Sequence, residues 1–425
     1  MNPSAIIFSV QVNTDPGKID EILSRATVDV IVKEELRKEL SSGRPLKIYL
    51  GTDPTGGDLH LGHATIHLKL RDFQELGHKV TLLVGDYTVL VGDHSDKTEE
   101  RVELKRGEIE ENMKTYKEQF GRSVDLTQVA YRYNSEWLAK LSFNEIIELS
   151  KIFTLQQMTE RDAFQKRVKA GKPVGFDELL YPIMQGYDAY ALQTDIQIGG
   201  TDQLFNLQAG RKIMDYFKVK PQAIITCPLL VGNDGRKMGK SLKNYISINS
   251  SAKDKYFGIM TIVDEIIINY FTLLTRVPMD EIAQMQRSLD ENSVNPRDLK
   301  MRLAFEITKH FHGVDQAHKA QAEFKKVVQN KELPESMAQM NLSDLLKMTT
   351  ELEVGEVGKN KYQLLKVIAC SQVIPSNAET RRLIEQGGVE INGDRVTDIQ
   401  HVFEPKKGDI IKVGKKKYIK IISNS

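Results

Sequence analysis

The stretch YLGTDPTGGDLHLGH, from Tyr49 to His63, decides the fold expected for this chain. It continues the apolar run LKI and leads into the helical pattern HATIHLKLRDFQEL, so it predicts a strand, a phosphate-sized loop and a helix start. A helix start presents unpaired backbone N–H groups, which bind anions. His60 and His63 add two side-chain donors there. The stretch therefore predicts a site for phosphates.

Further apolar runs suited to buried strands follow, and helical patterns separate them. The runs are KVTLLVGD, LTQVAYRY, DIQIGG and QAIITCPLLV. Such alternation predicts an α/β fold with a doubly wound, Rossmann-like parallel sheet, in which ligands bind at the carboxyl ends of the strands. Two short amphipathic helices, residues 18–25 and 30–40, are expected before the first strand.

The length of 425 residues predicts more than one domain. Apolar residues at helical spacing dominate from about residue 248, and a polar stretch with three glycines, ELEVGEVGKNK, precedes a last short helix and several strands. We expect an α/β catalytic domain over residues 1–247, an all-α domain over 248–345, a linker over 346–361 and a small α+β domain over 362–425.

Composition is that of a globular protein, with 40% hydrophobic and 28% charged residues. The two cysteines, Cys227 and Cys370, lie in apolar segments, which argues against a disulfide scaffold. No membrane span is expected, and we predict a cytoplasmic protein. From residue 361 onward, twelve Lys and Arg stand against seven Asp and Glu, a charge that favours an anionic partner, although a solvated basic surface is also compatible with it.

The loop DPTGGDLHLGH has the donors that an ATP-dependent reaction needs. His60 and His63 can offset charge on an attacked α-phosphate, Thr55 can donate to the outer phosphates, and Gly62 leaves room for a flat base. Two other interpretations are a metal site that includes His67 and incidental surface histidines. No cysteine is near, and a helix start favours anions over metals.

A second motif, KMGKS at residues 237–241, carries two lysines that would neutralise a departing pyrophosphate. It is unlike a P-loop, because the glycine required five residues before Gly239 is replaced by Asp234. The alternative is a basic surface loop.

HLGH followed by KMGKS resembles the signature pair of class I aminoacyl-tRNA synthetases. YPIMQGYD (residues 181–188) and QIGGTDQ (197–203) resemble the amino-acid pocket of bacterial tyrosyl-tRNA synthetases, and the resemblance covers essentially the whole chain. It implies two sets of binding residues. The tyrosine set is Tyr49, Asp93, Tyr181, Gln185, Asp188 and Gln203. The ATP set is Asp53, Thr55, Gly62, Lys97, Arg101, Gly200, Asp202, Lys237, Lys240 and Ser241.

Within these sets, the resemblance pairs Tyr49 with Asp188 around the phenolic hydroxyl of the substrate, one able to donate and the other to accept. Tyr181, Gln185 and Asp188 are four and then three residues apart, so we expect them on one helix face. The chain departs from some family members at Leu50, where they have a cysteine that can reach the ribose, and at Ile66, where they have a small polar residue.

The carboxyl segment SNAETRRLIEQGGVEINGDRV resembles a small RNA-binding module of a ribosomal small-subunit protein, pseudouridine synthases and bacterial tyrosyl synthetases. Arg381 and Arg382 on a short helix, with Lys415, Lys416 and Lys417 in a hairpin, would follow an RNA backbone. A purely structural module is the alternative.

The resemblance implies a tyrosine–tRNA ligase that forms tyrosyl-adenylate from tyrosine and ATP and then acylates tRNA(Tyr). It implies His60, His63, Lys237 and Lys240 as the catalytic residues, Mg²⁺ bridging the phosphates without a protein metal site, an anticodon-side role for the helical domain, and a homodimer. The alternatives are a tryptophanyl enzyme, a more distant nucleotidyltransferase, and a non-catalytic RNA-binding relative.

Overall fold

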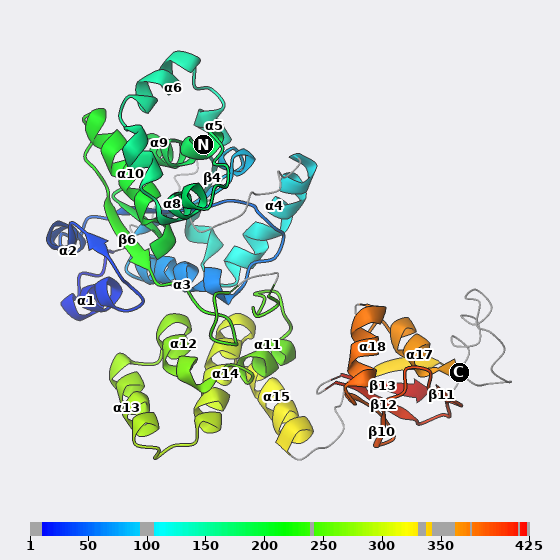
Figure 1. Ribbon diagram of the computed structural model, residues 1–425. Coiled ribbons are helices and arrows are strands. Elements are labelled where there is room, and N and C mark those ends of the chain that lie inside the picture. The colour runs from blue at the N-terminus through cyan, green and yellow to red at the C-terminus, as the bar shows by residue number, and fades with distance from the viewer. Residues whose placement is uncertain are drawn as a thin grey trace, which may run out of the picture. The chain divides into compact units, whose positions relative to one another are not determined.

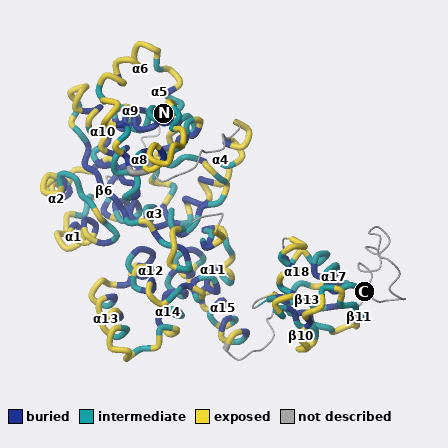
Figure 2. The backbone as a smooth tube through the Cα atoms, in the orientation of Figure 1, coloured by how far each residue is buried: buried dark blue, intermediate teal, exposed yellow. Residues whose placement is uncertain are grey.

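The computed structural model describes residues 11–93, 106–238, 242–329, 337–341, 362–374, 376–414 and 417–422. The chain packs as two compact units, residues 1–320 and 321–425. Each has its own buried core (Figures 1 and 2). The functional boundaries expected at residues 247, 345 and 361 stay predictions.

The first unit is built on a six-stranded sheet in the order β1-β6-β5-β2-β3-β4. All neighbouring strands run parallel except β1, which pairs antiparallel with β6. The chain starts the parallel sheet at β2, builds outward through β3 and β4, and returns to β5 on the other side of β2. This reversal confirms the doubly wound fold and places a crevice at the carboxyl ends of β2 and β5. The strands are β1 (Val30–Ile31), β2 (Lys47–Thr52), β3 (Lys79–Val84), β4 (Val129–Tyr133), β5 (Ile196–Gly200) and β6 (Ala223–Cys227).

Successive residues of a strand point to opposite faces of the sheet, and these strands have apolar residues on both faces. Helices therefore cover both faces. Ile48 and Leu50 of β2 join the core on the face of α3, whereas Tyr49 points to the opposite face and packs with Ala189 and Met214. Those two residues belong to α9 and α10. The helices of this part are α1 (Pro16–Ser24), α2 (Lys33–Leu40), α3 (Leu61–Glu75), α4 (Arg106–Gly121), α5 (Ser135–Leu138), α6 (Phe143–Ser150), α7 (Leu155–Thr159), α8 (Asp162–Lys169), α9 (Tyr181–Leu192) and α10 (Leu204–Tyr216).

The helix predicted over residues 30–40 is wrong at its start. Val30 and Ile31 form β1 and pair with Ile225 and Ile224, and α2 begins only at Lys33 after a left-handed Val32. The free edge of β6 offers hydrogen bonds to these two β-branched residues, so tertiary pairing overrides the helical pattern.

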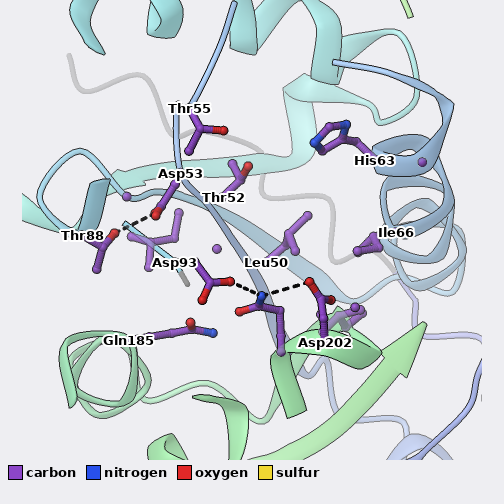
Figure 3. Close-up of a pocket in the computed structure, with 18 of the residues that line it drawn as sticks. Leu50, Thr52, Asp53, Thr55, His63, Ile66, Thr88, Asp93, Gln185 and Asp202 are labelled. Carbon is purple, nitrogen blue, oxygen red and sulfur yellow. Dashed lines mark hydrogen bonds between the residues drawn. The ribbon is translucent and has the colours of Figure 1, made fainter. Parts of the chain in front are cut away.

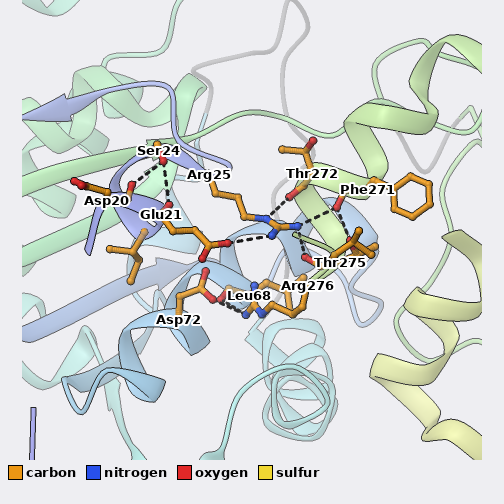
Figure 4. Close-up of polar contacts among 12 residues, drawn as sticks. Asp20, Glu21, Ser24, Arg25, Leu68, Asp72, Phe271, Thr272, Thr275 and Arg276 are labelled. Carbon is orange, nitrogen blue, oxygen red and sulfur yellow. Dashed lines mark hydrogen bonds and ion pairs between the residues drawn. The ribbon is translucent and has the colours of Figure 1, made fainter. Parts of the chain in front are cut away.

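A helical region follows the sheet, and the buried Arg25 at the end of α1 contacts it (Figure 4). The Arg25 guanidinium donates to the carbonyls of Thr275 (2.7 Å) and Thr272 (3.1 Å) at the end of α12, while Lys69 donates to the Ile22 carbonyl (2.7 Å) at the end of α1. Cations at helix carboxyl ends satisfy orphan carbonyls and oppose the helix dipole. This region contains α11 (Ala252–Ile259), α12 (Ile267–Leu274), α13 (Met279–Asp290), α14 (Pro296–His312) and α15 (Val314–Phe324).

Among its described residues, the second unit packs helices α17 and α18 with a five-stranded sheet in the order β10-β9-β12-β13-β7 and a two-stranded sheet of β8 and β11. β7 lies within the stretch expected to be helical, because it adds to the edge of β13 in parallel. The elements are α17 (Leu364–Cys370), α18 (Asn377–Glu385), β7 (Ala338–Asn341), β8 (Tyr362–Gln363), β9 (Val389–Ile391), β10 (Asp394–Val396), β11 (Val402–Phe403), β12 (Ile410–Val413) and β13 (Lys417–Ile422).

No single helix among the described residues is long and apolar enough to cross a membrane. One bent pair, α11 with residues 264–274, meets the requirement by length and composition alone. The apolar residues of both helices are largely buried in the core, as in many core helices.

Candidate active site

A cavity of about 500 Å³ lies at the carboxyl ends of β2, β3 and β5, where the fold places its crevice (Figure 3). Most of the residues predicted to bind tyrosine or ATP line it. They are Asp53, Thr55, His60, Gly62, His63, Asp93, Tyr181, Gln185, Asp188, Gly200, Asp202, Gln203 and Lys237. Lys97, Arg101, Lys240 and Ser241 lie outside the described residues.

Asp188 is a buried carboxylate in the wall of this cavity, only 3% exposed. Trp137 Nε1 donates to its Oδ1 (2.7 Å), and Asn134 Nδ2 donates to its Oδ2 (3.2 Å). Burial raises the pKa of Asp188 to about 8, although the two donors lower it. Asp188 shares the α9 face with Tyr181 and Gln185, as the spacing predicted, and all three line the cavity.

Tyr49 lies beside this wall without lining the cavity itself. Its side chain is 0% exposed, and its hydroxyl has no hydrogen-bond partner in the described part of the chain. Burial raises the pKa of Tyr49, and the charge of Asp188 raises it further. The Gln222 amide lowers this pKa, although it is not in hydrogen-bonding geometry with the Tyr49 hydroxyl. A buried hydroxyl without a partner is costly, and a phenolic hydroxyl between Tyr49 and Asp188 would satisfy both groups.

Asp53 follows β2 directly and organises the neighbouring side chains. Its carboxylate accepts from Thr88 Oγ1 (2.8 Å) and from the Tyr181 hydroxyl (3.0 Å). Gly85 is needed here, because a Cβ at that position would lie 2.0 Å from Asp53 Oδ1 and 2.3 Å from Thr88 Oγ1. Asp53 was predicted as an ATP residue, but these two contacts are to Thr88 and to Tyr181, a residue predicted to bind tyrosine. We call the wall formed by Asp53, Thr88, Tyr181, Asn134 and Asp188 the tyrosine wall, after that prediction.

Two further carboxylates line the cavity, those of Asp93 and of Asp202, which lies just before α10 (Figure 3). Gln203 Nε2 donates to Asp93 Oδ2 (2.6 Å) and more distantly to Asp202 Oδ2 (3.4 Å). Gln185 Oε1 is buried and lacks a hydrogen-bond partner among the residues described. This part of the cavity therefore presents acceptors, which suit an ammonium group.

The two histidines predicted to contact phosphates, His60 and His63, both line the cavity, and we call this part of it the phosphate end. His60 is the N-cap of α3, and its ring centroid lies 4.1 Å from that of His63. The His60 backbone N–H donates to His63 Nδ1 (3.2 Å), as in a capping box. A Cβ on Gly62 would lie 2.9 Å from His60 Nδ1 and 3.3 Å from Met238 Sδ, so glycine keeps the space between these groups open.

Lys237 reaches the cavity from a polar turn that follows β6. Its carbonyl accepts from Asn244 Nδ2 (3.1 Å), which also donates to Asp234 Oδ1 (2.8 Å). The Asn244 contact and the backbone N–H of Arg236 lower the pKa of Asp234 to about 2. The Lys237 side chain is exposed, so it can follow an incoming phosphate.

Leu50 and Ile66, the two departures from the family pattern, both line the cavity (Figure 3). Their side chains are aliphatic and offer a ribose no hydrogen bond. The two departures from the family pattern therefore lie inside the cavity.

Asn134, Trp137 and Thr88 belong to this site and were missed by the sequence reasoning. Asn134 is fully buried, accepts from the Tyr87 N–H (2.9 Å) and donates to Thr88 Oγ1 (3.0 Å) as well as to Asp188. It follows the end of β4 directly, so the rule that ligands lie at strand ends could have identified it. Trp137 and Thr88 carry no comparable signal.

The predicted RNA-binding residues that the structure describes lie in the second unit. Arg381 and Arg382 are exposed on α18, and Lys417 at the start of β13 donates to the Val373 carbonyl. Lys415 and Lys416 are outside the described residues.

Comparison with known proteins agrees with this geometry. The family model "tRNA synthetases class I (W and Y)" matches residues 41–329, and the model "Tyrosine--tRNA ligase SYY-like C-terminal domain" matches residues 344–421. The fold resembles two tyrosyl-tRNA synthetases, the truncated mitochondrial one of Aspergillus nidulans (TM-score 0.60, 22% identity, 73% of this chain and 94% of that one) and that of Archaeoglobus fulgidus (TM-score 0.57, 22% identity, 72% and 100%). The protein is a class I aminoacyl-tRNA synthetase.

Relatives that match nearly the whole chain identify the family within this class. The chain is 43% identical to the tyrosine–tRNA ligase of Thermotoga maritima, over 96% of this chain and 98% of that protein. It is 40% identical to that of Moorella thermoacetica, over 94% of each chain. The chain belongs to the tyrosine–tRNA ligase family, which confirms the predicted family and the predicted enzyme class.

Proposed function

We propose that this chain activates tyrosine with ATP and then transfers the tyrosyl group to the 3′ end of tRNA(Tyr). The observation that carries the proposal is the proximity of two buried polar groups, Asp188 in the cavity wall and Tyr49 next to it. Tyr49 has a buried hydroxyl that lacks a partner in the described structure, and Asp188 is a buried carboxylate. A substrate phenol can accept from Tyr49 and donate to Asp188, whereas phenylalanine would leave the Tyr49 hydroxyl without a partner.

The remaining roles are those that the family resemblance implies, and the described residues among them line the cavity. Asp93, Tyr181, Gln185 and Gln203 surround the place where the tyrosine ammonium and carboxylate would lie, next to Gly200 and Asp202 for the ribose. The tyrosine carboxylate then attacks the α-phosphate, and pyrophosphate leaves. His60, His63 and Lys237 would stabilise the charge on the phosphates, with Lys240 from the same motif, while Thr55 and Ser241 would donate to them.

No group of three or more His, Cys, Asp or Glu side chains suited to a metal occurs among the described residues. We propose that Mg²⁺ enters with ATP, held mainly by the phosphates and water, because this ion rarely needs an all-protein cage. Its contribution is to neutralise phosphate charge. The substrates are those of translation, so we place the enzyme in the cytoplasm.

We also propose a homodimer formed through exposed apolar residues of the first unit. Phe143 and Phe176 are 77% and 79% exposed, and Leu155 is 62% exposed. Their elements surround one apolar cluster that contains Leu149 and Met158. Sedimentation of the wild type should show a species of twice the chain mass, and Phe176→Asp should shift it toward the monomer. A monomeric wild type at micromolar concentration would contradict the dimer.

The reaction is tested by the exchange of labelled pyrophosphate into ATP, measured with magnesium and each standard amino acid separately. Exchange with tyrosine alone is expected. Exchange with tryptophan would reverse the substrate assignment. A folded chain that gives no exchange would favour a non-catalytic RNA-binding protein.

A further inference from the structure

Lys255 is a lysine in the interior of the protein, on α11, with 0% exposure. Its Nζ donates to the carbonyls of Ser247 (2.7 Å) and Ile248 (3.1 Å) and to Ser250 Oγ (3.0 Å). An ammonium group has three donors, so these three acceptors match it completely. All three donors of this side chain are therefore satisfied, although Lys255 is not among the tyrosine and ATP residues proposed above.

The segment that Lys255 holds is paired with the histidine motif. The Leu61 N–H donates to the Ile246 carbonyl (3.0 Å), and the Ile248 N–H donates to the Leu59 carbonyl (2.9 Å). His60 thus lies opposite Ser247 in a short antiparallel bridge. Outside this bridge, Ser247 Oγ donates to Asp58 Oδ1 (3.2 Å).

The same segment continues back toward Lys237. Asn244, two residues before Ile246, donates to the Lys237 carbonyl (3.1 Å), and the Tyr245 ring lies 5.6 Å from the His60 ring. Residues 244–248 therefore contact both the first and the second motif. A displacement of this segment would move His60 and Lys237 relative to each other.

The surroundings of Lys255 disfavour its charged form. Phe311 of α14 lies under the ammonium (4.8 Å to the ring centroid), Arg122 adds positive charge, and Asp254 and Asp58 offset it in part. Burial first, and then Arg122, lowers the pKa of Lys255 to about 7. An apolar residue of similar length would avoid desolvating a charge but would leave the two carbonyls and the Ser250 hydroxyl without this donor. The lysine therefore fixes the backbone of this segment at a cost in desolvation.

We propose that Lys255 is a positioning residue for the activation step, which holds residues 246–248 so that His60 and Lys237 face the same phosphates. The proposal rests on the proposed function. Lys255 does not touch the cavity and acts through the backbone of this segment. Small displacements of catalytic groups reduce rates strongly, because the reacting geometry is lost.

The test compares wild type, Lys255→Met and Ser250→Ala, with Lys253→Met as the matched control on the same helix. The measurements are kcat, the KM for ATP and the KM for tyrosine in pyrophosphate exchange, together with the melting temperature. We expect Lys255→Met to lower kcat about 10- to 100-fold. The KM for tyrosine should stay within about twofold of the wild type, because Asp188 and Tyr49 are held by other elements. Ser250→Ala, which removes one of three acceptors, should lower kcat about threefold, and Lys253→Met should resemble the wild type.

An unchanged kcat in folded Lys255→Met, or an equal loss in Lys253→Met, would overturn the proposal. A melting temperature that falls while kcat is retained would also overturn it, because that is the result of a purely structural role. If Lys255→Met does not fold, Ser250→Ala decides, and an unchanged kcat in that variant overturns the proposal. A wild type without tyrosine-dependent exchange would instead overturn the proposed function.

Discussion

The two ends of the active-site cavity are built differently. At the tyrosine wall, Asp188, Asn134, Thr88, Asp53 and Tyr181 form one continuous chain of hydrogen bonds. At the phosphate end, the groups are partly or largely exposed and lie on a helix start and a turn. A closed buried network fixes the shape and polarity of a pocket, whereas donors at the edge of the cavity can adapt to phosphates that move. From this difference we expect selection of the amino acid and stabilisation of the reacting phosphate to be separable properties of the site.

His63→Ala should have the largest effect on the reaction. Loss of one donor to a transition-state phosphate typically lowers kcat about 100- to 1000-fold. The KM for tyrosine should change little, because the tyrosine wall keeps its contacts. Steady-state pyrophosphate exchange measures both values, and a raised KM with a normal kcat would show that the histidine belongs to the amino-acid site.

Asp188→Ala tests the other end of the cavity, the tyrosine wall. Removing one partner of a buried hydrogen bond costs about 1–3 kcal/mol, so kcat/KM for tyrosine should fall roughly 5- to 150-fold. Circular dichroism should show an intact fold. Near-normal activation of tyrosine by the folded variant would remove the specificity argument.

Tyr49→Phe sharpens the comparison by removing only a hydroxyl. That hydroxyl is buried and lacks a partner in the described structure, so the variant should unfold at the same or a slightly higher temperature. The kcat/KM for tyrosine should nevertheless fall by about 3- to 10-fold, because a neutral hydrogen bond to the substrate is lost. A loss of stability in thermal unfolding would indicate that the hydroxyl has a structural role.

Leu50→Cys should have the smallest effect. A cysteine would add a weak hydrogen-bond group beside the expected ribose position, so the KM for ATP should change by no more than about threefold. The KM for tyrosine should stay the same. A large change in either value would mean that Leu50 does more than fill space.

The sequence predicted most of this cavity because its motifs follow strands, and the ends of parallel strands meet at one edge of a sheet. Gly200 was found in this way, whereas Tyr49 and Asp53 came from the family resemblance. Trp137 and Thr88 were missed, because they approach Asp188 and Asp53 from elements distant in sequence. β1 was mistaken for helix because its partner, β6, is almost two hundred residues away. Lys255 belongs to an unremarkable helical pattern, and only its three acceptors distinguish it.

The most direct test of the separation between the two ends is the ratio of kcat/KM for tyrosine to that for phenylalanine, measured by pyrophosphate exchange in wild type, Asp188→Ala and His63→Ala. The ratio should collapse in Asp188→Ala, because the wall no longer distinguishes the hydroxyl. It should be preserved in His63→Ala, where both substrates lose the same stabilisation of the phosphate. A preserved ratio in Asp188→Ala, or a collapsed one in His63→Ala, would contradict the account.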